Sequence, residues 1–178
     1  GDAIVDEANE QAISKGSGMF HLTSPAFSSN GPIPSQYTCD GEELSPPLAW
    51  EGVPAGAASL ALIVDDPDAP DPAAPKRVWV HWLLYNVDPQ EGGLVEGAGN
   101  TSPVGSARSG LNDGGSIGYQ GPCPPIGRHR YFFRLFALDG HLPDLGPRAR
   151  RADLERAMNG HVLATAVLMG TYAHPGKG

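Results

Sequence analysis

The sequence predicts a mostly β domain, an antiparallel β-sandwich with one or two short helices and long loops. Glycine and proline are both abundant, with 24 and 18 among 178 residues, and this suits many short strands joined by ordered turns. Several apolar runs have the length of a strand, and no internal repeat or heptad pattern is present. An antiparallel sandwich is the arrangement that such a pattern favours.

The length of the chain favours one domain preceded by a short arm. Residues 1–18 are polar and acidic and end in Gly-Ser-Gly, which is typical of a flexible N-terminal arm. We therefore expect the folded domain over residues 19–178. No apolar run approaches the length of a membrane span, and the compartment stays open between the cytoplasm and a secreted or periplasmic location.

The first half of the chain predicts extended structure. Residues 20–50 form short extended pieces broken by prolines. Residues 59–65, SLALIVD, predict a buried strand that ends at the acidic, proline-rich stretch DDPDAPDPAAP. Residues 77–87 predict a strand covered on both sides, because Val78, Val80, Trp82 and Leu84 alternate with Trp79, His81, Leu83 and Tyr85 and both faces are apolar.

The second half begins with a loop and ends with a strand. Residues 92–120 are rich in glycine and almost without pattern, which is typical of a functional or mobile loop. Residues 131–138, YFFRLFAL, predict the next strand. Asp153 is the expected N-cap of a short helix, LERAMNG, with Gly160 at its C-terminal cap. Residues 161–173 predict the last strand.

Charge and cysteine content restrict the functional class. The net charge of −8 argues against a nucleic-acid partner, which demands clustered Lys and Arg. The one basic cluster, at 148, 150 and 151, is interpreted as a solvated loop. Cys39 and Cys123 are too few for a structural zinc site by themselves. They either form a disulfide in an oxidising compartment or remain two small buried thiols, and both alternatives stay open.

Polar residues interrupt the predicted strands near rigid turns. His81 lies in the most hydrophobic strand and needs a partner for each ring nitrogen, and Asp66 points towards the core, where a carboxylate is costly unless paired. His129 and Tyr131 are two positions apart and share one face of a strand. Asp68 can cap a turn through backbone N–H groups. Each residue alone has a structural explanation, but together they indicate a pocket held in shape by prolines.

Three motifs in order carry a family resemblance. The segments DDPDAP (65–70), VWVHW (78–82) and GPCPPIGRHRYFFRLFAL (121–138) resemble the signature blocks of the phosphatidylethanolamine-binding protein family, also called Raf kinase inhibitor proteins. The segments YTCDGEELSPPLAW (37–50) and DLERAMNGHVLATAVLMGTY (153–172) are similar to its bacterial and archaeal branch. The resemblance extends from Phe20 to Tyr172 and implies an antiparallel β-sandwich with a small anion pocket at one end.

The resemblance also implies the ligand and the residues of the site. In the family, the pocket binds phosphate or the phosphoryl head group of phosphatidylethanolamine, and exposed backbone N–H groups of the GPCPP loop suit such an anion. Departures from the family include Cys123, where eukaryotic members usually carry Gly, a longer segment after DPDAP, and no C-terminal helix after the last strand. We therefore do not assume kinase inhibition. The ligand-binding residues carried over from the motifs are Asp66, Asp68, His81, Gly121, Cys123, Pro124, Pro125, His129 and Tyr131.

Two carboxylates beside a bound anion pose an electrostatic problem. We expect Asp66 to pair with His81 and to favour its charged form, and the ligand to be a singly protonated phosphate or an amine-bearing phosphoester. Affinity should then rise as the pH falls towards the range in which histidine titrates. A metal site built from Asp66, Asp68, His81 and His129 lacks tight ligand spacing, so neither a metal nor a cofactor is expected.

Three functions remain, in order of preference. The first is a non-enzymatic, regulatory binding protein for phosphate or phospholipid head groups. The second is a protein-interaction module that inhibits a protease or a kinase. The third is an enzyme that uses the Asp, His and Tyr side chains for acid–base chemistry, although no G-x-S-x-G motif is present. A homodimer stays open as an alternative to a monomer, because the resemblance implies bacterial relatives that often pair and strands this apolar can leave an exposed hydrophobic face.

Overall fold

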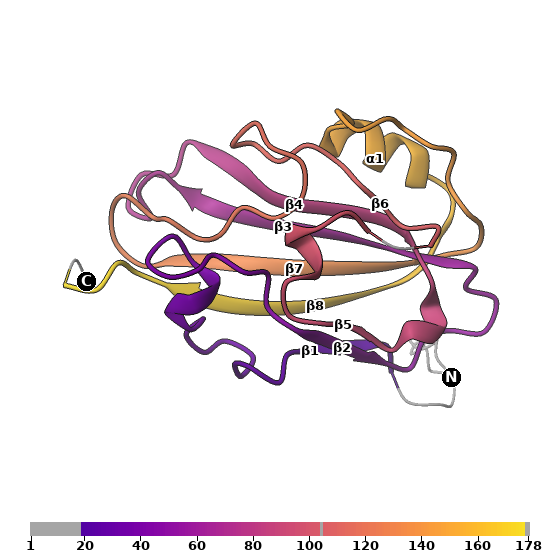
Figure 1. Ribbon diagram of the computed structural model, residues 1–178, viewed down its shortest axis with the longest axis horizontal. Coiled ribbons are helices and arrows are strands. Elements are labelled where there is room, and N and C mark those ends of the chain that lie inside the picture. The colour runs from indigo at the N-terminus through magenta and orange to yellow at the C-terminus, as the bar shows by residue number, and fades with distance from the viewer. Residues whose placement is uncertain (1–18, 104, 177–178) are drawn as a thin grey trace.

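The computed structural model describes residues 19–103 and 105–176, so the expected arm at residues 1–18 lies outside the described residues. The described chain forms mostly strands, with one α-helix, α1 (Arg151–Met158), and three short 3₁₀ turns, η1 (Ser35–Tyr37), η2 (Pro89–Glu91) and η3 (Ala98–Asn100) (Figure 1). It holds no helix of the length and apolarity that a membrane crossing needs. The strands are β1 (His21–Thr23), β2 (Leu48–Glu51), β3 (Ser59–Ala69), β4 (Arg77–Val87), β5 (Gly93–Leu94), β6 (Arg108–Ser109), β7 (His129–Leu138) and β8 (Val162–Tyr172).

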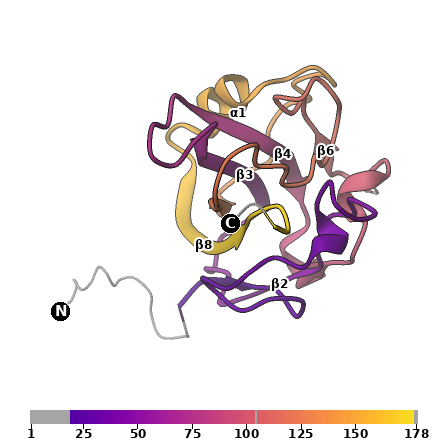
Figure 2. The same cartoon turned by 90° about the vertical axis from the view of Figure 1, so that its left-hand side faces the viewer.

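Two antiparallel sheets form the predicted sandwich. The larger sheet has the strand order β6-β4-β3-β7-β8, and the smaller has the order β1-β2-β5. Figures 1 and 2 show the smaller sheet on one side of the larger sheet and α1 on the other. The mostly β fold class with long loops and one short helix is therefore confirmed.

The hydrophobic core lies on both sides of the larger sheet. Leu60, Leu62 and Val64 of β3 pack in the cluster between the sheets, where they join side chains of β4 and β7. The alternate residues Ala61 and Ile63 pack in a second cluster beneath α1. Because both faces of β3 are covered, its sequence is apolar without alternation, as the run 59–65 predicts.

The predicted end of β3 at residue 65 is wrong, because the strand continues through DDPDA to Ala69. Asp65 and Asp66 are buried yet tolerated, since each carboxylate has a charged or hydrogen-bonding partner. The backbone N–H of Asp68 donates to Oδ1 of Asp66 at 2.7 Å, which holds the chain around Pro67. Proline and acidic residues therefore mark an irregular strand end here and not a loop.

The predicted start of α1 is also wrong, whereas Gly160 follows its end at φ 84°, as expected for a C-terminal cap. The helix begins at Arg151, and Asp153 lies inside its first turn, where Oδ2 accepts the backbone N–H of Arg150 at 2.9 Å. The interpretation of Arg151 as part of a solvated loop is therefore wrong, because it is the first residue of α1. Its Nη1 lies 2.8 Å from Oδ2 of the buried Asp65, which ties α1 to the sheet.

Candidate functional site

A cavity of about 260 Å³ lies at one end of the larger sheet, where β3 ends and where β4 and β7 begin. These ends meet because the three strands are antiparallel neighbours. Eight of the nine residues carried over from the motifs line this cavity. The lining residues are Asp66, Ala69, Pro70, Arg77, Trp79, His81, Gln120, Gly121, Cys123, Pro124, Pro125, His129 and Tyr131.

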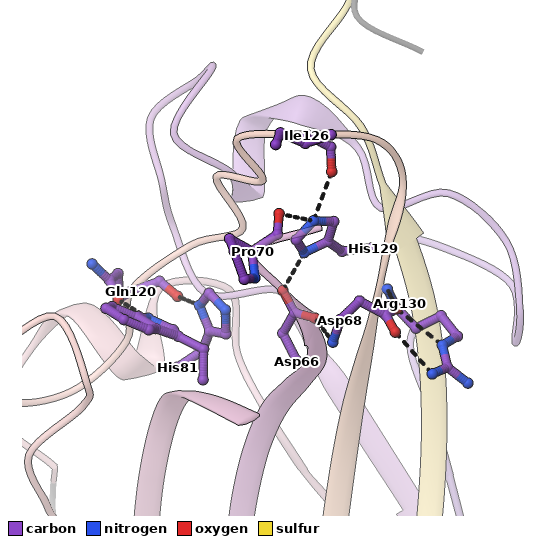
Figure 3. Close-up of polar contacts among 9 residues, drawn as sticks. Asp66, Asp68, Pro70, His81, Gln120, Ile126, His129 and Arg130 are labelled. Atoms are coloured by element: carbon purple, nitrogen blue, oxygen red, sulfur yellow. Dashed lines mark hydrogen bonds and ion pairs between the residues drawn. The ribbon is translucent and has the colours of Figure 1, made fainter. Parts of the chain in front are cut away.

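Asp68 is the ninth residue, and it is absent from the cavity lining. Its carboxylate accepts two hydrogen bonds from the guanidinium of Arg130, at 3.0 and 2.9 Å, and one from the backbone N–H of Arg130 at 2.9 Å (Figure 3). The hydrogen bond from the Arg130 side chain lowers the pKa of Asp68 below its ordinary value. Asp68 thus fastens the end of β3 to the start of β7, next to His129.

His129 is held by acceptors at both ring nitrogens (Figure 3). Its Nε2 lies 3.1 Å from the carbonyl oxygen of Pro70 and 2.9 Å from that of Ile126. Because a carbonyl only accepts, Nε2 must carry a hydrogen. Its Nδ1 lies 2.6 Å from Oδ2 of Asp66, so one proton occupies that contact, on the imidazole or on the carboxyl. In either form the Asp66–His129 pair carries no net charge.

The pairing of Asp66 with His81 that the sequence predicted is wrong. Nδ1 of His81 lies 2.7 Å from the backbone carbonyl of Gln120, which only accepts, so Nδ1 carries the hydrogen (Figure 3). Burial lowers the pKa of His81 to about 4, so the ring is neutral at neutral pH instead of charged. No described residue hydrogen-bonds its Nε2, which therefore offers a lone pair as an acceptor.

A β-bulge turns His81 towards the cavity. In the ladder between β3 and β4, Val80 is opposite Asp65 and Trp82 is opposite Val64, so His81 is an extra residue on β4. Such bulges re-aim side chains and are frequent beside functional sites. The bulge also corrects the strict alternation predicted for this strand, because Val80 packs on the α1 side of the sheet while Trp82 packs between the sheets.

Tyr131 lines the cavity and carries an unpaired donor. Its ring contacts both imidazoles, with centroids 5.3 Å from His81 and 6.3 Å from His129. Its hydroxyl is buried and has no hydrogen-bond partner, a condition that it shares, among the described residues, only with the indole nitrogen of Trp82. Burial raises the pKa of Tyr131, so the hydroxyl keeps its proton. An unsatisfied buried donor of this kind is costly unless a ligand supplies the acceptor.

The proline-rich loop forms one wall of the cavity. Cys123 is joined to Cys39 by a disulfide, which resolves the two alternatives that the sequence left open. The backbone N–H of Gly121 donates to Oε2 of Glu43 at 2.9 Å. A Cβ at Gly121 would lie 2.7 Å from the carbonyl oxygen of Tyr37, so the close approach of these segments requires glycine.

The loop supplies fewer backbone donors than the sequence predicted. Residues 122, 124 and 125 are prolines and have no N–H, and the N–H of Gly121 is already engaged. Within residues 121–125, the N–H of Cys123 is the one left without an acceptor among the described residues. The polar groups that this cavity offers therefore come mainly from side chains of β4 and β7.

Sequence reasoning missed five lining residues. Trp79 and Arg77 precede His81 at alternate positions of β4, so strand periodicity could have found them. The guanidinium carbon of Arg77 lies 5.9 Å from the centroid of the Trp79 ring, and the Trp79 indole N–H donates to Oε1 of Gln120 at 2.8 Å. Gln120 contacts His81 through its backbone carbonyl. Every residue has such a carbonyl, so the residue type at position 120 could not predict this contact. The other two missed residues are Ala69 and Pro70.

Most of this chain matches a family model, known relatives and solved structures. A family model described as "Phosphatidylethanolamine-binding protein" matches residues 23–173. A UPF0098 protein of Methanothermobacter thermautotrophicus is 54% identical over 154 residues, which are 85% of this chain and 97% of that protein. A crystal structure of a phosphatidylethanolamine-binding protein homologue from Chlamydia trachomatis is 46% identical, with a TM-score of 0.80, and covers 88% of this chain and 99% of its own.

A solved structure of lower sequence identity has a similar fold. An E. coli protein whose structure is described as a new member of the mammalian PEBP family is 31% identical, with a TM-score of 0.77. The alignment covers 87% of this chain and 98% of that one. These relatives match this chain over almost their whole length, and the solved structures share its fold.

Proposed function

The chain belongs to the phosphatidylethanolamine-binding protein family, and from that membership we propose that it is a binding protein for phosphate or a phosphoryl head group. The ligand occupies the cavity between the start of β4, the start of β7 and the proline-rich loop. Its phosphoryl group lies against Tyr131 and His81.

The single observation that carries this proposal is that Tyr131, a residue that lines the cavity, has a buried hydroxyl without a hydrogen-bond partner. A phosphoryl oxygen is a strong acceptor, and a hydrogen bond between a neutral donor and an anion is roughly twice as strong as one between neutral groups. Ligand binding would supply an acceptor for a donor that no described residue satisfies. The desolvation cost of that hydroxyl is then offset in the complex.

The other groups of the cavity suit a partly protonated anion. Nε2 of neutral His81 accepts a hydrogen bond, and a phosphoryl P–OH group donates one. Arg77 is the lining residue whose side chain is permanently cationic, and it supplies a positive charge at the rim. Asp66 does not repel the anion, because the proton that it shares with His129 neutralises the pair.

The same groups favour binding over catalysis. A nucleophilic mechanism needs an activated side chain, yet burial raises the pKa of Tyr131 and Cys123 is held in a disulfide. His129 is fixed by three acceptors, so moving its protons would break the contacts that hold it. Inhibition of a protease or a kinase is a separate activity that would need a partner surface outside this cavity.

Calorimetric titration with inorganic phosphate and with O-phosphoethanolamine tests the proposal. We expect both to bind the parent chain, and Tyr131→Phe to weaken binding by about 10- to 100-fold, because it removes one hydrogen bond to a charged group. Tyr85→Phe is the matched control, since Tyr85 is a buried tyrosine of the same sheet whose hydroxyl accepts the N–H of Leu145 on the α1 side. The control should bind as the parent does.

Two results would contradict the proposal. One is a parent chain that binds neither ligand, in which case the interaction and enzyme alternatives move ahead. The other is equal affinity in Tyr131→Phe and the parent chain. Tighter binding of O-phosphoethanolamine than of phosphate would identify a head group, and equal binding would identify free phosphate as sufficient.

A further inference from the structure

We propose that reduction of the Cys39–Cys123 disulfide creates a Zn²⁺ site formed by the two cysteine thiolates and His174. The site shares Cys123 with the lining of the cavity but includes neither Tyr131 nor His81. It does not depend on the function proposed above.

The three side chains already converge. One ligand atom from each of Cys39, Cys123 and His174 lies within 4.8 Å of the other two. Nε2 of His174 is 3.8 Å from Sγ of Cys123. Cys123 is exposed and the other two residues are partly exposed, so an ion can reach them from solvent. The third ligand that two cysteines lack for a zinc site thus comes from the segment after β8.

His174 is oriented as metal-binding histidines are. Its Nδ1 lies 2.8 Å from Oδ2 of Asp40, and the hydroxyl of Tyr172 donates to the same oxygen at 2.6 Å. A carboxylate accepts, so Nδ1 carries the hydrogen and Nε2 presents its lone pair towards the sulfurs. A carboxylate that receives the second ring N–H of a histidine ligand is a recurring feature of metal sites, where it fixes the ring and raises its basicity.

The spacing fits tetrahedral zinc. With Zn–S of about 2.3 Å and Zn–N of about 2.0 Å, ligand atoms at the tetrahedral angle are separated by about 3.5 Å for sulfur and nitrogen and about 3.8 Å for two sulfurs. Cys123 and His174 already have the first separation to within a few tenths of an ångström. Once the disulfide is broken, side-chain rotation lets the two sulfurs reach the second separation from Cα atoms that are 5.4 Å apart.

The chemistry is a two-electron reduction followed by proton release. A dithiol reductant transfers two electrons and two protons to the disulfide, which yields two thiols and leaves the reductant as its own disulfide. Zn²⁺ then displaces both thiol protons and binds two thiolates and the imidazole, with water in the fourth position. Two thiolates and one imidazole are a ligand set that zinc favours. The metal would keep the proline-rich loop tied to residue 39 when the covalent link is absent.

Co²⁺ is the probe that tests this site, because cobalt thiolates absorb strongly and tetrahedral Co²⁺ has its own visible bands. We expect both signals in the reduced parent chain at one equivalent of metal, and neither in the oxidised chain. Zn²⁺ should displace Co²⁺ and should protect Cys39 and Cys123 from alkylation. Asp40→Asn should weaken metal binding by about 10- to 100-fold as the loss of an orienting partner, and His174→Ala by at least as much.

The chain offers a matched control in His161, whose Nδ1 lies 2.9 Å from Oδ1 of Asp139 but which has no cysteine beside it. His161→Ala should bind Co²⁺ as the parent does. Circular dichroism of each reduced protein establishes that the fold is retained. The proposal is overturned if the reduced parent chain shows no thiolate absorption with Co²⁺, if His174→Ala binds as tightly as His161→Ala, or if reduction alone unfolds the chain.

Discussion

Nδ1 of His129 lies 2.6 Å from Oδ2 of Asp66, and only 1% and 5% of the two side chains is exposed. Burial raises the pKa of Asp66, while the hydrogen bond from His129 opposes that shift. Since Nε2 of His129 faces two carbonyls, the contact between Nδ1 and Asp66 holds one bridging proton, and the pair in this arrangement carries no net charge. A phosphoryl group can therefore bind beside a carboxylate without being repelled.

Substituting His129 should lower the free energy of unfolding more than substituting Asp66. His129→Ala leaves the Asp66 carboxylate buried without its partner and should lower the free energy of unfolding by about 3–5 kcal/mol. Asp66→Asn keeps a neutral pair, because the amide N–H₂ can donate to Nδ1 of neutral His129, and should cost about 1 kcal/mol or less. Urea unfolding at neutral pH measures both. Equal losses in the two variants would show that the bridging proton is not what the site requires.

The pKa of His81 predicts a loss of stability in mild acid. The unfolded chain takes up a proton at this residue near the ordinary value of 6.5, whereas the folded chain does so only at about 4. Stability from His81 is therefore present above pH 6.5 and is lost as the pH falls towards 4, by up to about 3 kcal/mol. His81→Gln should lose less stability over this window. Parallel pH profiles of the two proteins, measured by urea unfolding, would contradict the assignment.

The neutral ring of His81 also predicts which anions bind. If Nε2 accepts a hydrogen bond from the ligand, sulfate should bind much more weakly than phosphate, because it has the same shape but no proton to donate. A phosphomonoester loses its last proton near pH 6, so the affinity for O-phosphoethanolamine should fall by up to about tenfold per pH unit above that value. Calorimetry from about pH 5.5 to about pH 8.5 measures both trends. Equal binding of sulfate and phosphate, with no pH trend, would mean that His81 is not the acceptor.

The disulfide should contribute to stability without being essential for folding. It joins residues that are 84 positions apart, and loss of a native disulfide typically costs about 2–5 kcal/mol. Replacing both Cys39 and Cys123 with Ser should lower the unfolding midpoint accordingly, while circular dichroism of the folded state stays unchanged. A variant with the stability of the parent would show that the loop wall is held by its other contacts, such as that of Gly121 with Glu43.

The sequence predicted the strands that are buried on both faces and the motifs that gather at the cavity. Residues 77–87 form a strand with the predicted bounds, because an apolar run flanked by prolines leaves few alternatives. The motif resemblance brought together residues from three distant segments, which periodicity alone could not do. The family and the sandwich fold are accordingly confirmed.

The partner of Asp66 could not be predicted, because it depends on two features of tertiary structure. One is the register of β3 against β7, which brings His129 to the carboxylate. The other is the bulge at His81, which no residue type signals and which carries that ring to the carbonyl of Gln120. The ion pair of Arg151 with Asp65 was missed for a similar reason, since it joins residues 86 positions apart.

Asp65 and Asp66 are adjacent in β3 but serve opposite faces of the sheet. Oδ2 of Asp65 receives Arg134 and Arg151 on the α1 side, while Asp66 meets His129 at the cavity. A shift of one residue exchanges the faces of a strand. One residue inserted between Ser59 and Asp65 would move Asp65 to the position that faces His129, and one residue deleted there would move Asp66 to the position that faces Arg134 and Arg151. In each case the other carboxylate would lose its partners. The number of residues in this part of β3 is therefore constrained by two buried carboxylates at once, whereas the loop at 71–76 lies beyond the end of the strand.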